Sequence, residues 1–329
     1  METIEGNRLF SDGRIRIYGR AYESEGLMLD LTLSGFSTII DGESLTGIAD
    51  AFGGEFYFAV FADGKELPRV ALSGAGEREV VFASGLSRGR HTIEVYKMTE
   101  QNLGGVQIRS LTAPAFVAAP EEKSELITFY GDSITCGYGT EGISPEPFRP
   151  DTENPIRGYA YTLARIRNAD MEAVSYSGVS VSERIWVREF VLSDFAFSYS
   201  VHNRAAYPFP RESDIVVVNI GTNDAFAVLS QEGTEESLYN GYMVFIKQVL
   251  SVHKNAALVL TNGFMDPDPL LGRVIDRAYE TMKKQFPCRK IFRFTFPKDT
   301  GGANGHPTAA GQTEGGRLLA AFLAKVLPR

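Results

Sequence analysis

The stretch LITFYGDSIT, residues 126–135, joins a short apolar run to a turn that ends in a serine. Residues 126–130 have the length and the branched and aromatic content of a buried strand. Gly131 and Asp132 are turn residues, and Ser133 would open the following helix, where free backbone N–H groups point outward. A strand that passes directly into a helix is the unit from which parallel α/β sheets are built.

The chain downstream of this stretch keeps the same rhythm. Apolar runs alternate with long amphipathic segments, a pattern typical of strand–helix units. We predict five parallel strands, at residues 126–130, 172–176, 215–220, 257–261 and 290–294. The predicted helices are residues 158–169, 237–254, 270–286 and 307–327, the last beginning with Pro307, a residue type favoured at the first helical position.

The chain upstream has a different pattern. Up to about residue 111, short apolar stretches are separated by glycine-centred turns, with no helical period. Strand candidates are residues 14–18, 26–33, 56–61, 79–82 and 91–97. Such spacing predicts an antiparallel sandwich of the jelly-roll kind. An alanine- and proline-rich linker follows, so the predicted domains are residues 1–118 and 119–329.

Composition agrees with two folded domains and excludes several classes of protein. The chain has 329 residues, 43% hydrophobic and 22% charged, which is close to the globular average. Its 33 basic and 41 acidic side chains leave a net charge of −8 with no long basic run, so neither nucleic acid nor a membrane is an expected partner. The composition says nothing about the oligomeric state.

The cysteines and the N-terminus limit which metal sites, disulfides and cellular locations are expected. Cys136 and Cys288 cannot form a disulfide framework, and no Cys-x-x-Cys or His-x-x-x-His spacing offers a metal site, so we predict no metal. The first ten residues are acidic where a signal peptide is basic, and no apolar stretch follows them. The sequence as given therefore predicts a cytoplasmic protein, or a secreted one if a leader has been removed.

Small and polar residues follow four of the predicted strands. In open parallel sheets, ligands bind beyond the carboxyl ends of the strands. Ser133, Gly178 and Asn223 follow strands one to three, and His306 follows strand five on a glycine-rich loop. Each of these signals alone is ordinary turn composition, but turn composition gives no reason for all four to recur at one edge.

These four residues are the parts of an acyl-transfer site. A serine hydroxyl is a weak nucleophile unless a base takes its proton, and of the four histidines only His306 lies at a strand-end loop of this sheet. The backbone N–H groups of Ser133 and Gly178 and the side-chain amide of Asn223 would form an oxyanion hole. We expect Asp132 to stabilise the turn. No cofactor is needed for this chemistry.

The residues YGDSITCGYG (130–139), Gly178, VNIGTND (218–224) and the late His306-Pro307 resemble the SGNH (GDSL) hydrolase superfamily. The resemblance covers roughly residues 125–329 and implies a three-layer α/β domain with Ser133, Gly178, Asn223 and His306 in the site. The extended first block and the N-terminal sandwich resemble more narrowly the second carbohydrate esterase family. Its members pair a jelly-roll domain with an SGNH domain and remove acetyl groups from xylan and glucomannan.

One position departs from the superfamily pattern. An aspartate is usual three residues before the histidine, and that position here is Ala303. In the serine-protease template, replacing the corresponding aspartate by its amide costs about 10⁴ in turnover. Because some members of the second esterase family orient the histidine with a main-chain carbonyl, a Ser133–His306 dyad remains the expectation. Either the side-chain oxygen of Asn304 or a loop carbonyl could accept the Nδ1 proton.

The implied function is a metal-free serine esterase that removes acetyl groups from xylan, glucomannan or derived oligosaccharides. Residues 186–209 form an aromatic stretch, which is more often core or a subunit interface than a sugar site. Within it, Trp186, the only tryptophan, is a candidate substrate contact. Two alternatives stay open: a lipase or thioesterase of the same superfamily, and an inert carbohydrate-binding protein.

Overall fold

The computed structural model of the chain describes residues 1–182, 184–265 and 269–328. Two compact units make up the fold. The first contains Met1–Glu122 and Tyr199–Asn203, and the second contains Lys123–Ser198 and Arg204–Arg329. The sequence prediction has a single boundary, after residue 118. In the structure the boundary follows residue 122, and a short later segment belongs to the first unit.

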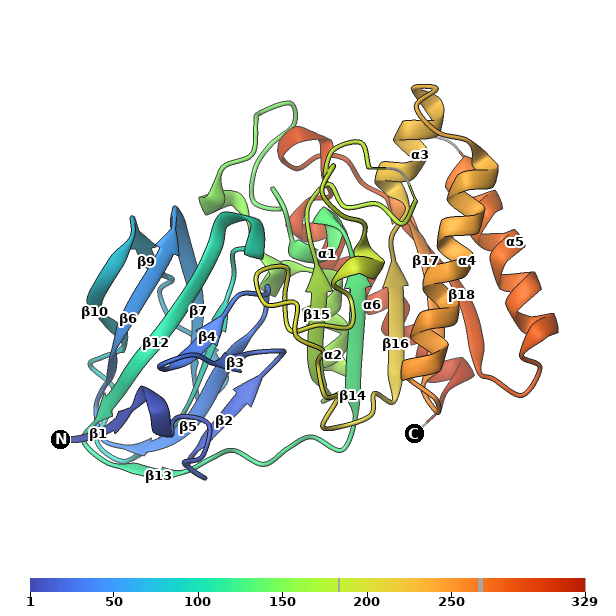
Figure 1. The fold of residues 1–329 in the computed structure, drawn as a ribbon. Helices are drawn as coiled ribbons and strands as arrows, with labels where there is room; N and C mark the ends of the chain where they lie inside the picture. Colours follow the sequence, from blue (N-terminus) through green and yellow to red (C-terminus); the bar gives the residue numbers. More distant parts are fainter. Residues whose placement is uncertain (183, 266–268, 329) are drawn as a thin grey trace. The chain divides into compact units, whose positions relative to one another are not determined.

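The first unit is a β-sandwich of two antiparallel sheets (Figure 1). One sheet has the order β10-β6-β12-β4-β3, with β1 paired to β12. The other has the order β13-β5-β11-β7-β8, with β2 paired to β5 and β9 to β7. The strands are β1 (Glu2–Glu5), β2 (Ile15–Tyr18), β3 (Tyr22–Glu23), β4 (Leu27–Leu29), β5 (Gly35–Asp41), β6 (Leu45–Gly53), β7 (Glu55–Ala62), β8 (Lys65–Glu66), β9 (Val70–Ser73), β10 (Gly76–Ala83), β11 (Arg90–Lys97), β12 (Gly104–Ala113) and β13 (Phe116–Ala118).

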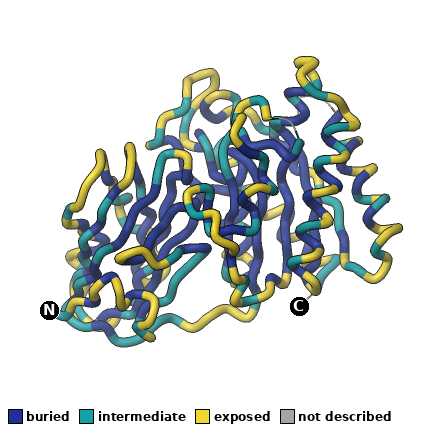
Figure 2. Tube along the Cα trace, in the orientation of Figure 1, coloured by how far each residue is buried: buried dark blue, intermediate teal, exposed yellow. Residues whose placement is uncertain are grey.

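Apolar side chains from both sheets meet in the centre of this sandwich, where Figure 2 shows the trace to be buried. The ring of Phe82 packs edge-to-face against Phe36 and Phe58, with centroids 5.5 and 5.9 Å away. The sequence prediction missed β5, β6 and β12. In β6, a Cβ on Gly47 would lie 2.5 Å from the carbonyl oxygen of Ser110 on the paired strand. This glycine permits close strand pairing and does not mark a turn.

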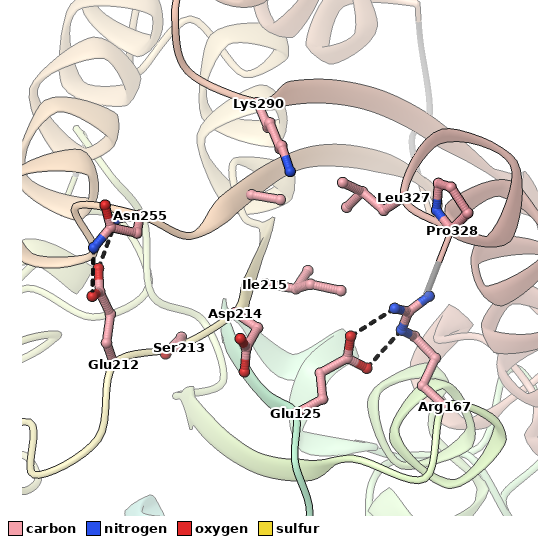
Figure 3. A pocket seen from close by; sticks show the side chains of 11 residues that line it. Glu125, Arg167, Glu212, Ser213, Asp214, Ile215, Asn255, Lys290, Leu327 and Pro328 are labelled. Atoms are coloured by element: carbon pink, nitrogen blue, oxygen red, sulfur yellow. Dashed lines mark hydrogen bonds and ion pairs between the residues drawn. The ribbon is translucent and has the colours of Figure 1, made fainter.

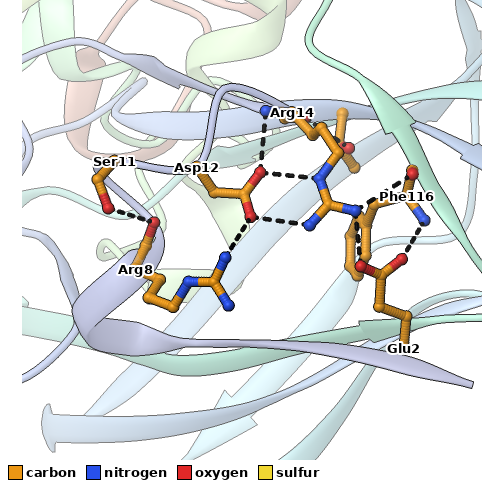
Figure 4. A network of polar contacts seen from close by, with 7 residues as sticks. Glu2, Arg8, Ser11, Asp12, Arg14 and Phe116 are labelled. Atoms are coloured by element: carbon orange, nitrogen blue, oxygen red, sulfur yellow. Dashed lines mark hydrogen bonds and ion pairs between the residues drawn. The ribbon is translucent and has the colours of Figure 1, made fainter.

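An arginine ties the start of the sandwich to its last strand (Figure 4). Arg14 donates to Asp12 at 2.8 Å and to Glu2 at 2.6 Å, and Glu2 accepts the backbone N–H of Phe116 at 3.1 Å. Hydrogen bonding from Arg14 lowers the pKa of Asp12 to about 2, so Asp12 stays ionised through the usual pH range. The network joins β1, the segment before β2, and β13.

The segment Tyr199–Asn203 joins the sandwich through polar contacts that its sequence pattern does not predict. Ser200 donates its hydroxyl to the buried carboxylate of Asp30 at 2.6 Å, and the Tyr22 hydroxyl donates to the same carboxylate at 2.8 Å. The backbone N–H of Val201 donates to the side chain of Gln101 at 2.8 Å. Buried polar groups need such partners, so these contacts hold the segment in place.

The second unit is built on a five-stranded parallel sheet with the order β15-β14-β16-β17-β18. Its strands are β14 (Leu126–Gly131), β15 (Asp170–Ser175), β16 (Ile215–Asn219), β17 (Ala257–Phe264) and β18 (Ile291–Lys298). The helices are α1 (Ser133–Cys136), α2 (Tyr159–Ile166), α3 (Thr222–Leu229), α4 (Glu235–Val252), α5 (Leu270–Gln285) and α6 (Ala309–Val326). None of these helices combines the length and the apolar character that a bilayer crossing requires.

Helices cover both faces of this sheet, so the unit has the three predicted layers (Figure 1). Phe129 and Tyr130 are neighbours on β14, and neighbouring strand residues point to opposite faces. The Phe129 ring packs on Tyr159 of α2, and the Tyr130 ring packs on Phe245 of α4. Helix α2 in turn packs on α6, and α4 packs on α5. The α/β fold class and the sandwich domain predicted from the sequence are therefore confirmed.

Two helix predictions need correction. The sequence prediction has no helix at residues 222–229, but they form α3, because Gly221 in the left-handed region (φ 110°) turns the chain directly from β16 into a helix. Pro307 was expected at the first helical position. Instead Thr308 is the N-cap of α6, accepting the N–H of Gly311 at 3.0 Å, and Pro307 precedes the cap.

Candidate active site

Ser133 is held at the carboxyl edge of the sheet by the turn between β14 and α1. Asp132 is the N-cap of α1, and its Oδ1 accepts the N–H of Ile134 at 3.0 Å. Gly131 must be glycine, because a Cβ there would lie 2.0 Å from the hydroxyl oxygen of Thr135. Ser133 is therefore the first residue of a short helix, where the N–H groups have no acceptor within the helix.

His306 reaches the serine from the far edge of the sheet. Its Nε2 lies 2.9 Å from Ser133 Oγ, within the hydrogen-bonding reach of a nucleophile and its base. The residue is 7% exposed, and burial lowers the pKa of His306 to about 4, because the charged ring would lose its hydration. At neutral pH the imidazole is thus neutral and able to accept the serine proton.

The position where an aspartate is usual, residue 303, has no space for a longer side chain. Ala303 is fully buried, and none of the described residues completes a hydrogen bond of normal geometry with His306 Nδ1. The main-chain carbonyls of Asn304 and Ala303 partly offset the effect of burial on the pKa of His306. Because the Asn304 residue is exposed, with a left-handed backbone (φ 51°), these observations favour a loop carbonyl over its side chain as the orienting group.

Strand register places the expected oxyanion donors on either side of the serine. Gly131 of β14 pairs with Ser175 of β15 on one side and with Asn219 of β16 on the other. Gly178 follows β15 with φ +80°, a conformation that favours glycine. Asn223 is the second residue of α3, directly beyond β16.

The two donors are linked to each other. Asn223 Nδ2 donates to the carbonyl of Val179, next to Gly178, at 2.9 Å. The carboxylate of Asp224 accepts the N–H groups of Val181 and Ser182 at 3.1 and 2.9 Å. These bonds hold the Gly178 loop on the first turn of α3, and the bond to Val179 uses one of the two amide hydrogens of Asn223.

Ionisation of the Asp132 carboxyl group is unfavourable in the folded protein, which the sequence pattern did not predict. Its side chain is fully buried, and its Oδ2 has no hydrogen-bond partner among the described residues. Burial, together with the nearby charge of Asp224, raises the pKa of Asp132 to about 7. The carboxyl group therefore caps the helix and is partly protonated near neutral pH.

Trp186 stands apart from the other aromatic residues of its stretch. Phe190 and Phe195 are buried and pack on each other and on Tyr176, as a core would. Trp186 is 66% exposed, and its Cβ lies 3.1 Å from where a Cβ on Gly178 would be. It lines a cavity of about 320 Å³ with Ile185, Arg188, Phe226, Ala227, Ser230 and Glu232.

A second cavity, of about 310 Å³, lies at the other end of the sheet (Figure 3). Its walls include Ile215 and Ala257, where β16 and β17 begin, and Glu125, which pairs with Arg167 at 2.6 Å. This is the amino edge of the strands. Ligands in parallel sheets bind at the carboxyl edge, so this cavity is not the site of Ser133.

The three-layer fold and the Ser133–His306 pair at the carboxyl edge are the features of the serine hydrolase class. Residues 129–313 match the model of the GDSL-like lipase/acylhydrolase family, and the chain belongs to that family. Residues 17–120 match the model of the carbohydrate esterase 2 N-terminal domain. Both matches agree with the resemblance predicted from the motifs.

Relatives extend this likeness over both units. The chain is 31% identical to a cellulase/esterase CelE of Acetivibrio thermocellus over 78% of its own length, and it spans only 33% of that relative. It is 24% identical to an acetylxylan esterase/glucomannan deacetylase of Cellvibrio japonicus, over 91% of this chain and 85% of the relative. A solved family two carbohydrate esterase from Clostridium thermocellum, in complex with cellohexaose, superposes with a TM-score of 0.89 at 26% identity, covering 95% of this chain and 99% of that one.

Proposed function

We propose that the protein is a carbohydrate acetyl esterase, which removes O-acetyl groups from xylan, glucomannan or oligosaccharides derived from them. The observation that carries this proposal is the 2.9 Å hydrogen bond between His306 Nε2 and Ser133 Oγ in a chain of this family. The likeness to acetylxylan esterases and to an oligosaccharide-bound esterase supports the substrate class.

The reaction follows from the geometry. His306 takes the hydroxyl proton as Ser133 Oγ forms a bond to the acetyl carbonyl carbon, and the oxyanion is held by the N–H groups of Ser133 and Gly178 and by the amide of Asn223. When the tetrahedral intermediate collapses, the ester C–O bond breaks and the sugar oxygen receives the proton from His306. Water then attacks the acetyl-enzyme with the same base, which releases acetate and restores the serine.

Replacing the nucleophile tests the reaction. The Ser133→Ala variant should release no acetate from acetylated xylan above background and should unfold at the same temperature as the parent chain, because only one buried oxygen is lost. Ser251→Ala, an exposed serine on α4, is the matched control and should keep full activity. Substantial acetate release by Ser133→Ala would refute the assignment. Comparing acetyl with octanoyl esters separates an acetyl esterase from a lipase or thioesterase.

Trp186 is the proposed sugar contact. Trp186 is exposed, its Cβ lies beside Gly178, and aromatic faces with polar rims suit sugar rings. Trp186→Ala should raise KM for acetylated xylo-oligosaccharides about tenfold, while KM for 4-nitrophenyl acetate, which has no sugar, stays within about twofold. Phe52→Ala, another exposed aromatic residue, should change neither value. Equal KM values for wild type and Trp186→Ala on the oligosaccharide would exclude this contact.

A further inference from the structure

The loop that carries His306 lacks the usual aspartate, and the structure has no space for one at residue 303. Ala303 is fully buried, and its N–H donates to the carbonyl of Gly139 at 2.9 Å. A Cβ on Gly139 or on Gly142 would lie 2.9 or 2.5 Å from the Ala303 Cβ. The backbone of this segment therefore fills the space that a longer side chain at residue 303 would need, and the imidazole must be held in another way.

An aromatic ring covers His306 instead. The Tyr138 and His306 rings have centroids 4.3 Å apart at an interplanar angle of 39°. Phe148 stacks on Tyr138, at 4.0 Å and 15°. Tyr138 and Phe148 are both half-buried. The three rings form a column that restricts rotation of the imidazole, because swinging it away from Ser133 would break the ring contact.

The backbone ties this column to the nucleophile and to the histidine loop together. The N–H of Tyr138 donates to the carbonyl of Ser133 at 3.1 Å, so the ring is anchored to the nucleophilic residue itself. On the other side, the N–H of Asn304 donates to the main-chain carbonyl of Glu146 at 2.7 Å. Further bonds run from the N–H of Ser144 to Gly301 at 2.9 Å and from the N–H of Ala309 to Thr140 at 2.9 Å.

We propose that Tyr138, backed by Phe148, is a positioning residue of His306, and that its ring packing, together with the loop carbonyl, holds the imidazole in a chain that lacks the usual carboxylate. The electron-rich face of the tyrosine also favours the imidazolium that forms when His306 takes the serine proton. This inference rests on the proposed esterase function for its kinetic test. The ring contact itself can be measured without any activity.

The kinetic test compares Tyr138→Phe with Tyr138→Leu on 4-nitrophenyl acetate. Tyr138→Phe keeps the ring and should keep kcat within about threefold. Tyr138→Leu should lower kcat by about 10- to 100-fold with little change in KM, because a misplaced base affects the transition state more than substrate binding. Phe148→Leu should give a smaller loss in the same direction. Tyr18→Leu, which breaks a comparable ring stack with Tyr96 in the sandwich, is the matched control and should leave kcat unchanged.

Proton NMR of His306 supplies the second measurement, with His306→Gln used to assign its ring signals. The Tyr138 ring should shift these signals upfield in the wild type and in Tyr138→Phe, and the shift should vanish in Tyr138→Leu. A folded Tyr138→Leu variant with near wild-type kcat would overturn the proposal. So would a Tyr138→Phe variant as slow as Tyr138→Leu, because the hydroxyl would then be the active group.

The two measurements also separate this inference from the proposed function. If the wild type hydrolyses no ester, the esterase proposal fails, and the chemical shift still decides whether Tyr138 holds His306. If Tyr138→Leu does not fold, two other measurements test the proposal: the loss of kcat in Phe148→Leu and the upfield shift of the His306 ring signals in Tyr138→Phe. An unchanged kcat in Phe148→Leu, together with unshifted His306 signals in the wild type, would overturn the proposal.

Discussion

The acid limb of the pH–rate profile is the sharpest test of the buried dyad. His306 is 7% exposed, and burial lowers its pKa from 6.5 to about 4. The difference corresponds to about 3 kcal/mol against protonating the ring in place. A carboxylate would oppose this effect by stabilising the imidazolium, but the acid position holds Ala303. The missing acid therefore lets burial determine the pKa of His306.

The expected profile follows from the requirement that the base be neutral. The pH dependence of kcat/KM reports the pKa of the base in the free enzyme. At pH 5.5 an ordinary histidine would be only about a tenth neutral, whereas one with a pKa of about 4 would be nearly all neutral. We expect kcat/KM to stay almost constant from pH 7.5 to 5.5 and to fall about tenfold per unit only below pH 4.

Acetate released from an acetylated xylo-oligosaccharide, quantified by proton NMR, gives kcat/KM at each pH without a pH-sensitive dye. Circular dichroism at each pH is the control for unfolding, which is needed because the same shift weakens the fold in acid. Between pH 6.5 and 4 the unfolded chain binds a proton at His306 that the folded chain does not, so stability falls as the pH falls through this window. A limb centred above pH 6 would refute this reasoning, unless it disappears in Asp132→Asn, in which case Asp132 is the titrating group.

Three further predictions concern the residues around the dyad. Asn223→Ala should lower kcat by about 10²- to 10³-fold on 4-nitrophenyl acetate with little change in KM, because one oxyanion donor is lost; an unchanged kcat would remove Asn223 from the site. Ala303→Asp should lower the melting temperature and not raise kcat, because it buries a carboxylate where Gly139 leaves no space, at a cost of several kcal/mol; a faster enzyme would show that the triad can be restored. Asp132→Asn should raise the free energy of unfolding at pH 8, measured by urea titration, and have little effect at pH 4. The pKa of Asp132 rises from 3.8 to about 7 on folding, so ionisation in the folded state costs on the order of 4 kcal/mol, a cost present in full only above pH 7. Asparagine is an equally good N-cap, so equal effects at both pH values would contradict this account.

The second unit was predictable because its signals are local. The five strands were located from apolar runs alone, because strands that are buried on both faces consist of nearly uninterrupted hydrophobic residues. The turn into α1 was visible in Gly131 and Asp132, which satisfy local backbone requirements. In contrast, α3 was not predicted, because a glycine before a short helix resembles a glycine in a turn. The sandwich strands β5, β6 and β12 were missed. In β6, Gly47 is required by the close approach of Ser110 on β12, which is distant in the sequence and gives no local signal.

The sequence by itself determined the two-unit architecture, the parallel sheet and the chemical identity of the candidate site, because residue types and strand ends follow from short-range rules. Only the tertiary structure decided how His306, which follows β18, comes within 2.9 Å of Ser133, which follows β14, although two strands lie between β14 and β18. That approach depends on hydrogen bonds between residues 139–146 and the histidine loop. The contact of Tyr138 with His306, the closed space at Ala303 and the raised pKa of Asp132 likewise arise from segments distant in sequence, whose packing no local pattern encodes.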